Sequence, residues 1–104
     1  MNLSIHRSPK PGSLRLEGVF SYPGHTAFQE ATQELVDDPE VGEIRLDLSG
    51  ISHLDSSALG MLLLLRQKAE TRHKPVVLLN SPPLILKLLR SVSFGKLFQI
   101  QSGG

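Results

Sequence analysis

The chain has 104 residues, a formal net charge of +1, an apolar fraction of 39% and no cysteine. This length fits one compact domain, which we assign to residues 1–104 with residues 1–2 and 101–104 as loose termini. The balanced charge and the few aromatic residues argue against direct nucleic-acid binding. Without cysteine the chain has no disulfide framework, iron–sulfur cluster or thiolate zinc site, which fits the reducing cytoplasm.

The leucine-rich run from Leu59 to Leu65 raises the question of a membrane segment. This run is far shorter than the roughly 20 apolar residues that cross a bilayer, and Arg66 and Lys68 follow it. The amino terminus is short and polar, unlike a secretory signal peptide. We therefore expect no membrane insertion and a cytoplasmic location.

The first third of the chain predicts a β-hairpin followed by a helix. Apolar and polar residues alternate over 3–7 and again over 14–20, as in half-buried strands, and the segment 9–12 has the composition of a turn. Residues 21–25 interrupt the second strand. A helix then ends near Pro39, because the residue before a proline avoids helical geometry. The apolar face of this helix contains Phe28, Ala31 and Leu35.

The middle of the chain predicts another strand and the central helix. Residues 44–48 alternate between an apolar and a polar face, and Ser49-Gly50 indicates a turn. A helix is expected from residue 55 or 56 to about residue 72. Its first half is apolar on all sides, which predicts that Leu59 to Leu65 are buried, with an exposed interface patch as the alternative for part of the run.

The last third of the chain predicts a central strand and a third helix. Residues 75–79 form a continuous apolar run. Ser81 followed by Pro82 has the pattern of an N-cap and a first helical residue. The helix that follows is expected to bury Leu84, Ile85, Leu88 and Leu89. Residues 97–100 are compatible with a last short strand or with the start of a C-terminal helix.

The order of these elements is β-β-α-β-α-β-α, with a last strand as one option. Crossovers between parallel strands are right-handed. If the second, third and fourth strands lie side by side in chain order, every helix lies on the same face of the sheet. The opposite, open face is then lined by alternate polar residues of the strands, namely Arg15, Glu17, Arg45 and Asp47.

The segment Asp55-Ser56-Ser57 lies where the third strand turns into the central helix. A helix start has free backbone N–H groups and a partial positive charge, which favour anions. Three roles are open for these residues: a helix cap, a nucleophile or a phosphate acceptor. As a cap, Asp55, Ser56 or Ser57 would accept a backbone N–H. As an acceptor, a serine would gain about −1.5 to −2 charges without unfolding the helix.

Enzyme and metal chemistry find little support in the sequence. The nucleophile elbow G-x-S-x-G is absent around Ser57, and no P-loop or G-x-G-x-x-G sequence is present. The four histidines form neither an i, i+4 pair nor an H-x-H cluster, so we expect no metal site. His25 and His53 both follow predicted strand ends, where they would lie close together and contact a partner. We expect no catalytic residue and no cofactor.

The segments Leu46-Asp47-Leu48-Ser49-Gly50 and Leu54-Asp55-Ser56-Ser57-Ala58-Leu59-Gly60 resemble the STAS family, and most closely the bacterial anti-sigma-factor antagonists. Members share a D-L-S strand end and a D-S-S-G/A-L-G sequence that opens a helix. The similarity extends over nearly the whole chain. It implies a single α/β domain with a mixed, mostly parallel sheet of four to five strands, an N-terminal β-hairpin and helices mainly on one face.

In this family the second serine of the pair is phosphorylated, which corresponds to Ser57, with Ser56 as the alternative acceptor. The resemblance implies a non-enzymatic regulatory adaptor in a partner-switching pathway. Unphosphorylated, it would bind an anti-sigma-type serine protein kinase and thereby free a sigma factor or another regulator. Phosphorylation would release the kinase, and a metal-dependent PP2C-type serine phosphatase would reverse the modification. The expected partner-binding residues are Asp55, Ser56, Ser57, Ser21, Tyr22, His25 and His53.

Two positions depart from the family pattern. Many members carry an acid in the loop after the second strand, where Ser21 stands here, followed by Tyr22-Pro23-Gly24. Ala58 is often glycine in the family, and alanine favours the helix by about 1 kcal/mol. The alternative function is a constitutive STAS subunit of a transport complex, in which the hydroxyls only cap the helix.

Overall fold

The computed structural model describes residues 3–101, which form five strands, three α-helices and two short 3-10 helices. The strands are β1 Ser4–Arg7, β2 Ser13–Phe20, β3 Ile44–Leu54, β4 Val76–Leu79 and β5 Gln99–Gln101. The α-helices are α1 His25–Asp37, α2 Ser56–Glu70 and α3 Pro83–Ser91. The 3-10 helices are η1 Tyr22–Gly24 and η2 Phe94–Lys96.

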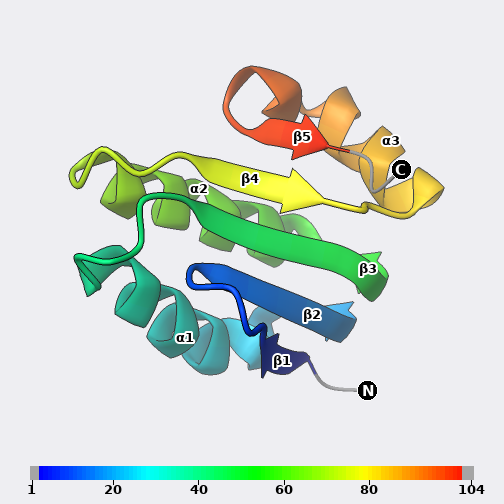
Figure 1. Ribbon diagram of the computed structural model, residues 1–104. Coiled ribbons are helices and arrows are strands. Elements are labelled where there is room, and N and C mark those ends of the chain that lie inside the picture. Colours follow the sequence, from blue (N-terminus) through cyan, green and yellow to red (C-terminus); the bar gives the residue numbers. More distant parts are fainter. Residues whose placement is uncertain (1–2, 102–104) are drawn as a thin grey trace.

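The five strands form one sheet in chain order, from β1 to β5 (Figure 1). β1 and β2 are antiparallel, with Ile5 opposite Leu16, whereas each later pair is parallel. The predicted hairpin and the mostly parallel sheet are therefore confirmed. Three helical connections that all step in one direction along the sheet place α1, α2 and α3 on the same face, because such crossovers are right-handed.

One hydrophobic core lies between this face and the helices. Leu16, Leu46, Leu48 and Leu78 of the sheet are fully buried in the same cluster as helical residues. The helical members include Phe28 of α1, Leu62 of α2 and Leu89 of α3. The rings of Phe20 and Phe28 lie 4.9 Å apart and join β2 to α1. Burial of so many aliphatic side chains on one face is the main favourable term in folding.

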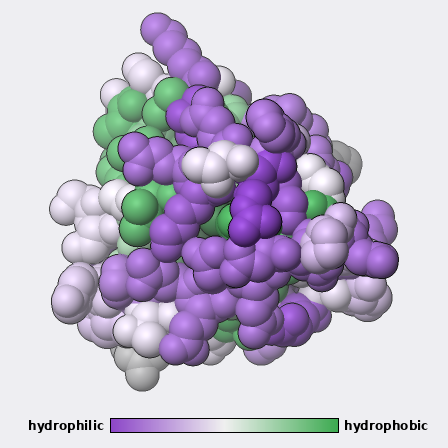
Figure 2. All heavy atoms as spheres, turned by 90° about the vertical axis from the view of Figure 1, so that its left-hand side faces the viewer, coloured by the Kyte–Doolittle hydropathy of each residue, from purple (hydrophilic) through white to green (hydrophobic). Residues whose placement is uncertain are grey.

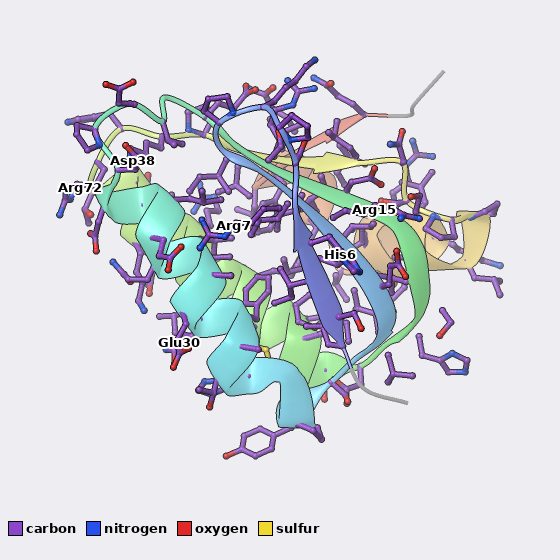
Figure 3. All side chains as sticks on the ribbon, turned by 60° about the horizontal axis from the view of Figure 1, so that its bottom comes forward. His6, Arg7, Arg15, Glu30, Asp38 and Arg72 are labelled. Atoms are coloured by element: carbon purple, nitrogen blue, oxygen red, sulfur yellow. The ribbon has the colours of Figure 1, made fainter. Side chains whose placement is uncertain are left out.

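The opposite face of the sheet is polar, as the alternation in β2 and β3 predicts. Register places His6, Arg15 and Asp47 in one row across β1, β2 and β3. The Arg15 guanidinium lies 2.6 Å from the carboxylate of Glu17, and the corresponding distance from Arg45 to Glu43 is 3.0 Å. Figure 3 shows His6 and Arg15 on neighbouring strands, turned away from α1. The open face thus carries ion pairs, whereas the three α-helices cover the other face of the sheet.

The predicted turn at Ser49-Gly50 is wrong, because β3 continues to Leu54. β2 pairs with this extension, with Glu17 opposite Gly50 and Phe20 opposite Leu54. A Cβ on Gly50 would lie 2.6 Å from Cγ of Glu17. Gly50 is therefore present for the close approach of two strands rather than for a turn. β3 is therefore longer than predicted, and α2 begins at Ser56, shortly after its end.

The carboxyl-terminal third differs from the prediction at three points. Of the two options for residues 97–100, the structure contains a strand, β5. This strand includes Gln101, which the sequence predicts as part of the loose terminus. Residues 1–2 and 102–104, the rest of the predicted loose termini, lie outside the described residues. α3 begins at Pro83, with Pro82 rather than Ser81 at the N-cap. Leu84 is 80% exposed, not buried, because Ile85 and Leu89 form the side of α3 that faces the core.

The end of the molecule where α1 and α2 finish is mainly hydrophilic (Figure 2). Lys74 Nζ donates hydrogen bonds to the carbonyl oxygens of Leu35, Val36 and Asp38 at 2.9, 2.7 and 2.7 Å. These carbonyls lie at the carboxyl end of α1, where helical carbonyls lack intrahelical donors. Arg72 adds an ion pair to Asp37 at 3.3 Å, and Figure 3 shows Arg72 and Asp38 at this corner. The serine pair is at the other end of α2.

Candidate functional site

Asp55 caps α2, which decides between the three capping candidates. Its backbone is extended, with φ −112° and ψ −176°, and its Oδ1 accepts a hydrogen bond from the Ala58 amide at 3.0 Å. The Asp55 carbonyl accepts the Leu59 amide at 3.1 Å. An acidic N-cap also interacts favourably with the helix dipole. The hydroxyls of Ser56 and Ser57 make no contribution to this cap and are free for another role.

Ser56 and Ser57 occupy the first two positions of α2. Ser56 is exposed and Ser57 is half-buried. Ala58, the next residue, is fully buried in the core. Packing of Ala58 therefore holds the backbone beside Ser57 in place, and the Ser57 side chain is half-buried.

The loop between β2 and α1 borders this helix start. The Asp55 amide donates to the Phe20 carbonyl at 3.3 Å, which fixes the end of β2 beside the start of α2. Ser21 comes next and its carbonyl accepts the Gly24 amide at 3.0 Å. This turn brings Ser21 and Tyr22, two of the predicted partner-binding residues, to the same end of the domain as Ser57.

Tyr22 and His25 form a stacked aromatic pair at the start of α1. Their ring centroids lie 5.8 Å apart with an interplanar angle of 19°, and Tyr22 is 69% exposed. The turn Tyr22-Pro23-Gly24 is a 3-10 helix with buried Gly24, where a Cβ would lie 2.9 Å from Cβ of Leu3. Close packing against Leu3 therefore explains the glycine, and the turn presents the tyrosine ring to solvent.

His53 is exposed near the end of β3, in register with Val19 of β2. Its neighbour Leu54 is buried, in register with Phe20. His53 thus lies near the end of β3, whereas His25 is the first residue of α1, after the η1 turn that follows β2. Among the described residues, His25 makes its aromatic contact with Tyr22 and makes none with His53.

The leucine run of α2 is divided between core and surface. Met61, Leu62 and Leu65 are buried, whereas Leu63 and Leu64 are 40% and 38% exposed. Leu64 lines a shallow groove between α1 and α2 together with His25, Phe28, Gln29, Thr32, Met61, Leu65 and Lys68. The prediction of a buried run is therefore correct for part of it, and its stated alternative, an exposed patch, holds for the rest. The buried residues recur at helical spacing from Ala58, and that spacing could have placed Leu63 and Leu64 outside.

Asp47 belongs to the open face of the sheet rather than to this edge. Its Oδ1 accepts the Ser49 amide at 2.9 Å. Partial burial would raise the pKa of the Asp47 carboxyl, but hydrogen bonds from Ser49 and Asn80 and the charge of Arg15 hold the pKa below its ordinary value. The D-L-S motif thus lies within β3 and contributes a carboxylate that accepts a backbone amide of the same strand.

Residues 3–101 contain no group of three His, Cys, Asp or Glu side chains placed to hold a metal ion. None of the helices described has both the length and the apolar character that a membrane span requires.

Comparison with known proteins now assigns the family. Residues 3–100 match the family model described as Mlab, STAS domain. This chain belongs to the STAS family. A STAS-domain containing protein of Pseudomonas aeruginosa (strain UCBPP-PA14) is 35% identical to it over 88 residues, which cover 85% of each protein.

Solved structures share the STAS fold at low sequence identity. A putative anti-sigma factor antagonist from Thermotoga maritima has a TM-score of 0.75 and 13% identity, with 95% of this chain and 85% of that chain covered. The Bacillus cell fate determinant SpoIIAA in its phosphorylated form has a TM-score of 0.69 and 16% identity, with coverage of 95% and 90%. The unphosphorylated anti-sigma factor antagonist SpoIIAA has the same score and identity, with coverage of 95% and 86%. The predicted STAS-like fold is thereby confirmed.

Proposed function

We propose that this STAS protein is a regulatory adaptor of the anti-sigma-factor-antagonist type, switched by phosphorylation of Ser57. Unphosphorylated, it binds an anti-sigma-type serine protein kinase in the cytoplasm. Phosphorylation of Ser57 releases the kinase, and a PP2C-type serine phosphatase restores binding. The observation that supports this proposal is the capping of α2 by Asp55, since the half-buried Ser57 is then not needed as the N-cap.

The position of Ser57 suits a switch that changes binding but leaves the fold intact. A phosphate there lies at the positive end of the helix dipole, which favours a negative charge by about 0.3–1 kcal/mol at an exposed site. It also adds about −1.5 to −2 charges to the surface. Proteins of the same fold are known in both states, since SpoIIAA has been solved phosphorylated and unphosphorylated.

The kinase-binding surface in this proposal consists of the residues around that hydroxyl. Tyr22, stacked on His25, offers a large exposed ring, and such rings are favoured at protein interfaces. The remaining members are Asp55, Ser56, Ser21 and His53. Where many antagonists carry an acid after the second strand, this chain has Ser21, followed by the exposed Tyr22 on a 3-10 turn. The partner surface should therefore contain an apolar site that accepts an aromatic ring.

The experiment incubates the protein with its cognate kinase and ATP and maps the phosphate by mass spectrometry. We expect phosphate on Ser57 and none in Ser57→Ala, while the matched variant Ser56→Ala is modified like the parent protein. Ser57→Asp should lose kinase binding and keep its melting temperature within a few degrees. Phosphate on Ser56 instead, or an unmodified Ser57 in an active kinase reaction, would contradict the switch.

A constitutive STAS subunit of a transport complex is the second candidate. The observation in its favour is that Ser57 is half-buried. In such a subunit Ser57 would contact the transporter subunit without being modified. In that case Ser57→Asp would weaken a transporter subunit's binding, and no kinase would modify the protein. The family is generally non-enzymatic, and we propose no catalytic role for either serine.

A further inference from the structure

Charge is unevenly distributed along this chain. No Asp or Glu follows Glu70, whereas five cationic residues do: Arg72, Lys74, Lys87, Arg90 and Lys96. Arg72 and Lys74 are bound to the carboxyl end of α1, by the ion pair and the carbonyl hydrogen bonds described above. Among residues 3–101, the other three make no ion pair. Lys87 and Arg90 of α3 are therefore exposed cations without an ion pair to any described residue, whereas Lys96 of η2 lines a pocket together with Glu70 at the end of α2.

A large apolar side chain, Leu84, lies on the same helix as Lys87 and Arg90. Leu84 in the first turn of α3 is 80% exposed. Helical periodicity places Lys87 between Leu84 and Arg90 on the exposed side of α3, and both cations are exposed. Val92 and Leu97, at the far end of α3 and after η2, are 40% and 38% exposed. The result is an apolar projection bordered by cations.

We propose that this surface of α3, Leu84 with Lys87 and Arg90, is a second docking surface for a protein partner whose contact area is acidic around an apolar pocket. Charge complementarity identifies the chemistry of the partner, because two exposed cations without an ion pair among the described residues, Lys87 and Arg90, favour a surface rich in carboxylates. Leu84 supplies the buried contact at its centre. The surface lies at the β4–β5 edge of the sheet, whereas the Tyr22–His25 pair lies at the β2–α1 connection (Figure 1). This inference does not depend on the proposed function of Ser57.

The structure favours a protein over a membrane surface. A helix that lies in a lipid interface buries a continuous apolar face in the bilayer. The apolar face of α3, with Ile85 and Leu89, is already buried in the core of this domain. Leu84 alone is left to project from the first turn, which suits a pocket rather than a bilayer.

The test uses the ¹⁵N-labelled full chain and a synthetic helical peptide with leucines on one side and glutamates beside them. We expect amide shifts confined to residues 83–97 and a dissociation constant that rises with salt, since charges are screened within about 3 Å at about 1 M salt. The same peptide with lysine in place of glutamate should cause no shifts. Leu84→Ser should weaken binding about tenfold or more, because it removes one buried leucine. Lys87→Glu should weaken it and reduce the salt dependence.

Two control variants make the result specific. Leu63→Ser changes a leucine of similar type on α2 that is 40% exposed, and it should bind the peptide like the parent chain. Ser57→Asp should also bind unchanged, which separates this surface from the proposed switch. Melting curves of all variants should coincide within a few degrees, because every substituted side chain is at the surface.

Four outcomes would overturn the proposal. The first is that no binding is detected at the highest soluble peptide concentration, and the second is that the amide shifts are centred on α2. The other two outcomes are interactions of the chain that Leu84→Ser abolishes. One is binding of the chain to phosphatidylglycerol-containing vesicles that Leu84→Ser abolishes, which would identify a lipid surface. The other is a concentration-dependent oligomer in sedimentation that Leu84→Ser abolishes, which would identify a second copy of the chain as the occupant.

Discussion

The starts of α2 and α3 can be compared directly, because each follows a parallel strand and each has serine near the turn. At α2 the sequence Asp55-Ser56-Ser57 places the acid at the N-cap, where its carboxylate accepts the Ala58 amide. At α3 the two prolines set the register: Pro83 is the first helical residue, and Pro82 is the cap without a side-chain hydrogen bond. Ser81 is left one position too early, and its Oγ is buried without a partner.

This difference shows which serines are free to function. At α2 an acid does the capping, so two hydroxyls remain at an accessible, electrostatically positive helix start. At α3 Pro82 occupies the N-cap, so Ser81 stands one residue too early to cap the Leu84 or Ile85 amide. The two helices also differ in the exposure of one leucine each: Leu62 of α2 is fully buried, whereas Leu84 of α3 is mostly exposed.

The largest expected difference between the two helices is in their leucines. Leu62→Ala should destabilise the fold by about 2–5 kcal/mol, because it removes core contacts and leaves a cavity. Leu84→Ala should change stability by no more than about 0.5 kcal/mol, as surface substitutions do. Urea denaturation of the two variants measures both values. Similar losses in both would mean that α3 is packed differently from the structure described here.

A smaller difference is expected between the two caps. Asp55→Ala should cost about 1 kcal/mol, the usual loss for an N-cap side chain. Ser81→Ala should be neutral or slightly stabilising, because it removes a buried hydroxyl that has no hydrogen bond. Thermal melting by circular dichroism compares the two variants with the parent chain. If Ser81→Ala proved the more harmful change, the assignment of the caps would be reversed.

The smallest effect is expected at Asp47, whose carboxylate holds the Ser49 amide much as Asp55 holds that of Ala58. Because the folded-state pKa of Asp47 lies below its ordinary value of 3.8, its stabilising contribution is complete above that pH. The contribution is lost as pH falls through the lowered pKa. Asp47→Asn should therefore be less stable than the parent at neutral pH and lose less stability on acidification.

Denaturation at a series of pH values from neutral to acid measures this dependence. Asp47 is partly exposed, so solvent screens its interactions and the effect should be small. Parallel curves for Asp47→Asn and the parent chain would show that this carboxylate does not contribute to the acid sensitivity of the fold.

The serine motif shows how much of the site could be predicted from the sequence. The D-S-S-A-L-G segment at a strand-to-helix turn identified the family and the candidate residues, because capping residues and apolar periodicity are local signals. It left open which of the three residues caps the helix, since each has a suitable oxygen acceptor. Only the extended backbone of Asp55, fixed where the end of β3 pairs with β2, decided this in favour of the acid.

By itself the sequence determined the order of the elements, the hairpin, the polar open face of the sheet and the position of the serine pair, because each depends on residues close together in the chain. The tertiary structure decided what depends on distant partners. Pairing with β2 extended β3 through Gly50, and pairing with β4 made a strand of residues 99–101. Packing against the sheet chose Ile85 and Leu89 for the core and left Leu84 in solvent, since an isolated leucine-rich helix does not specify which of its leucines the rest of the chain will cover.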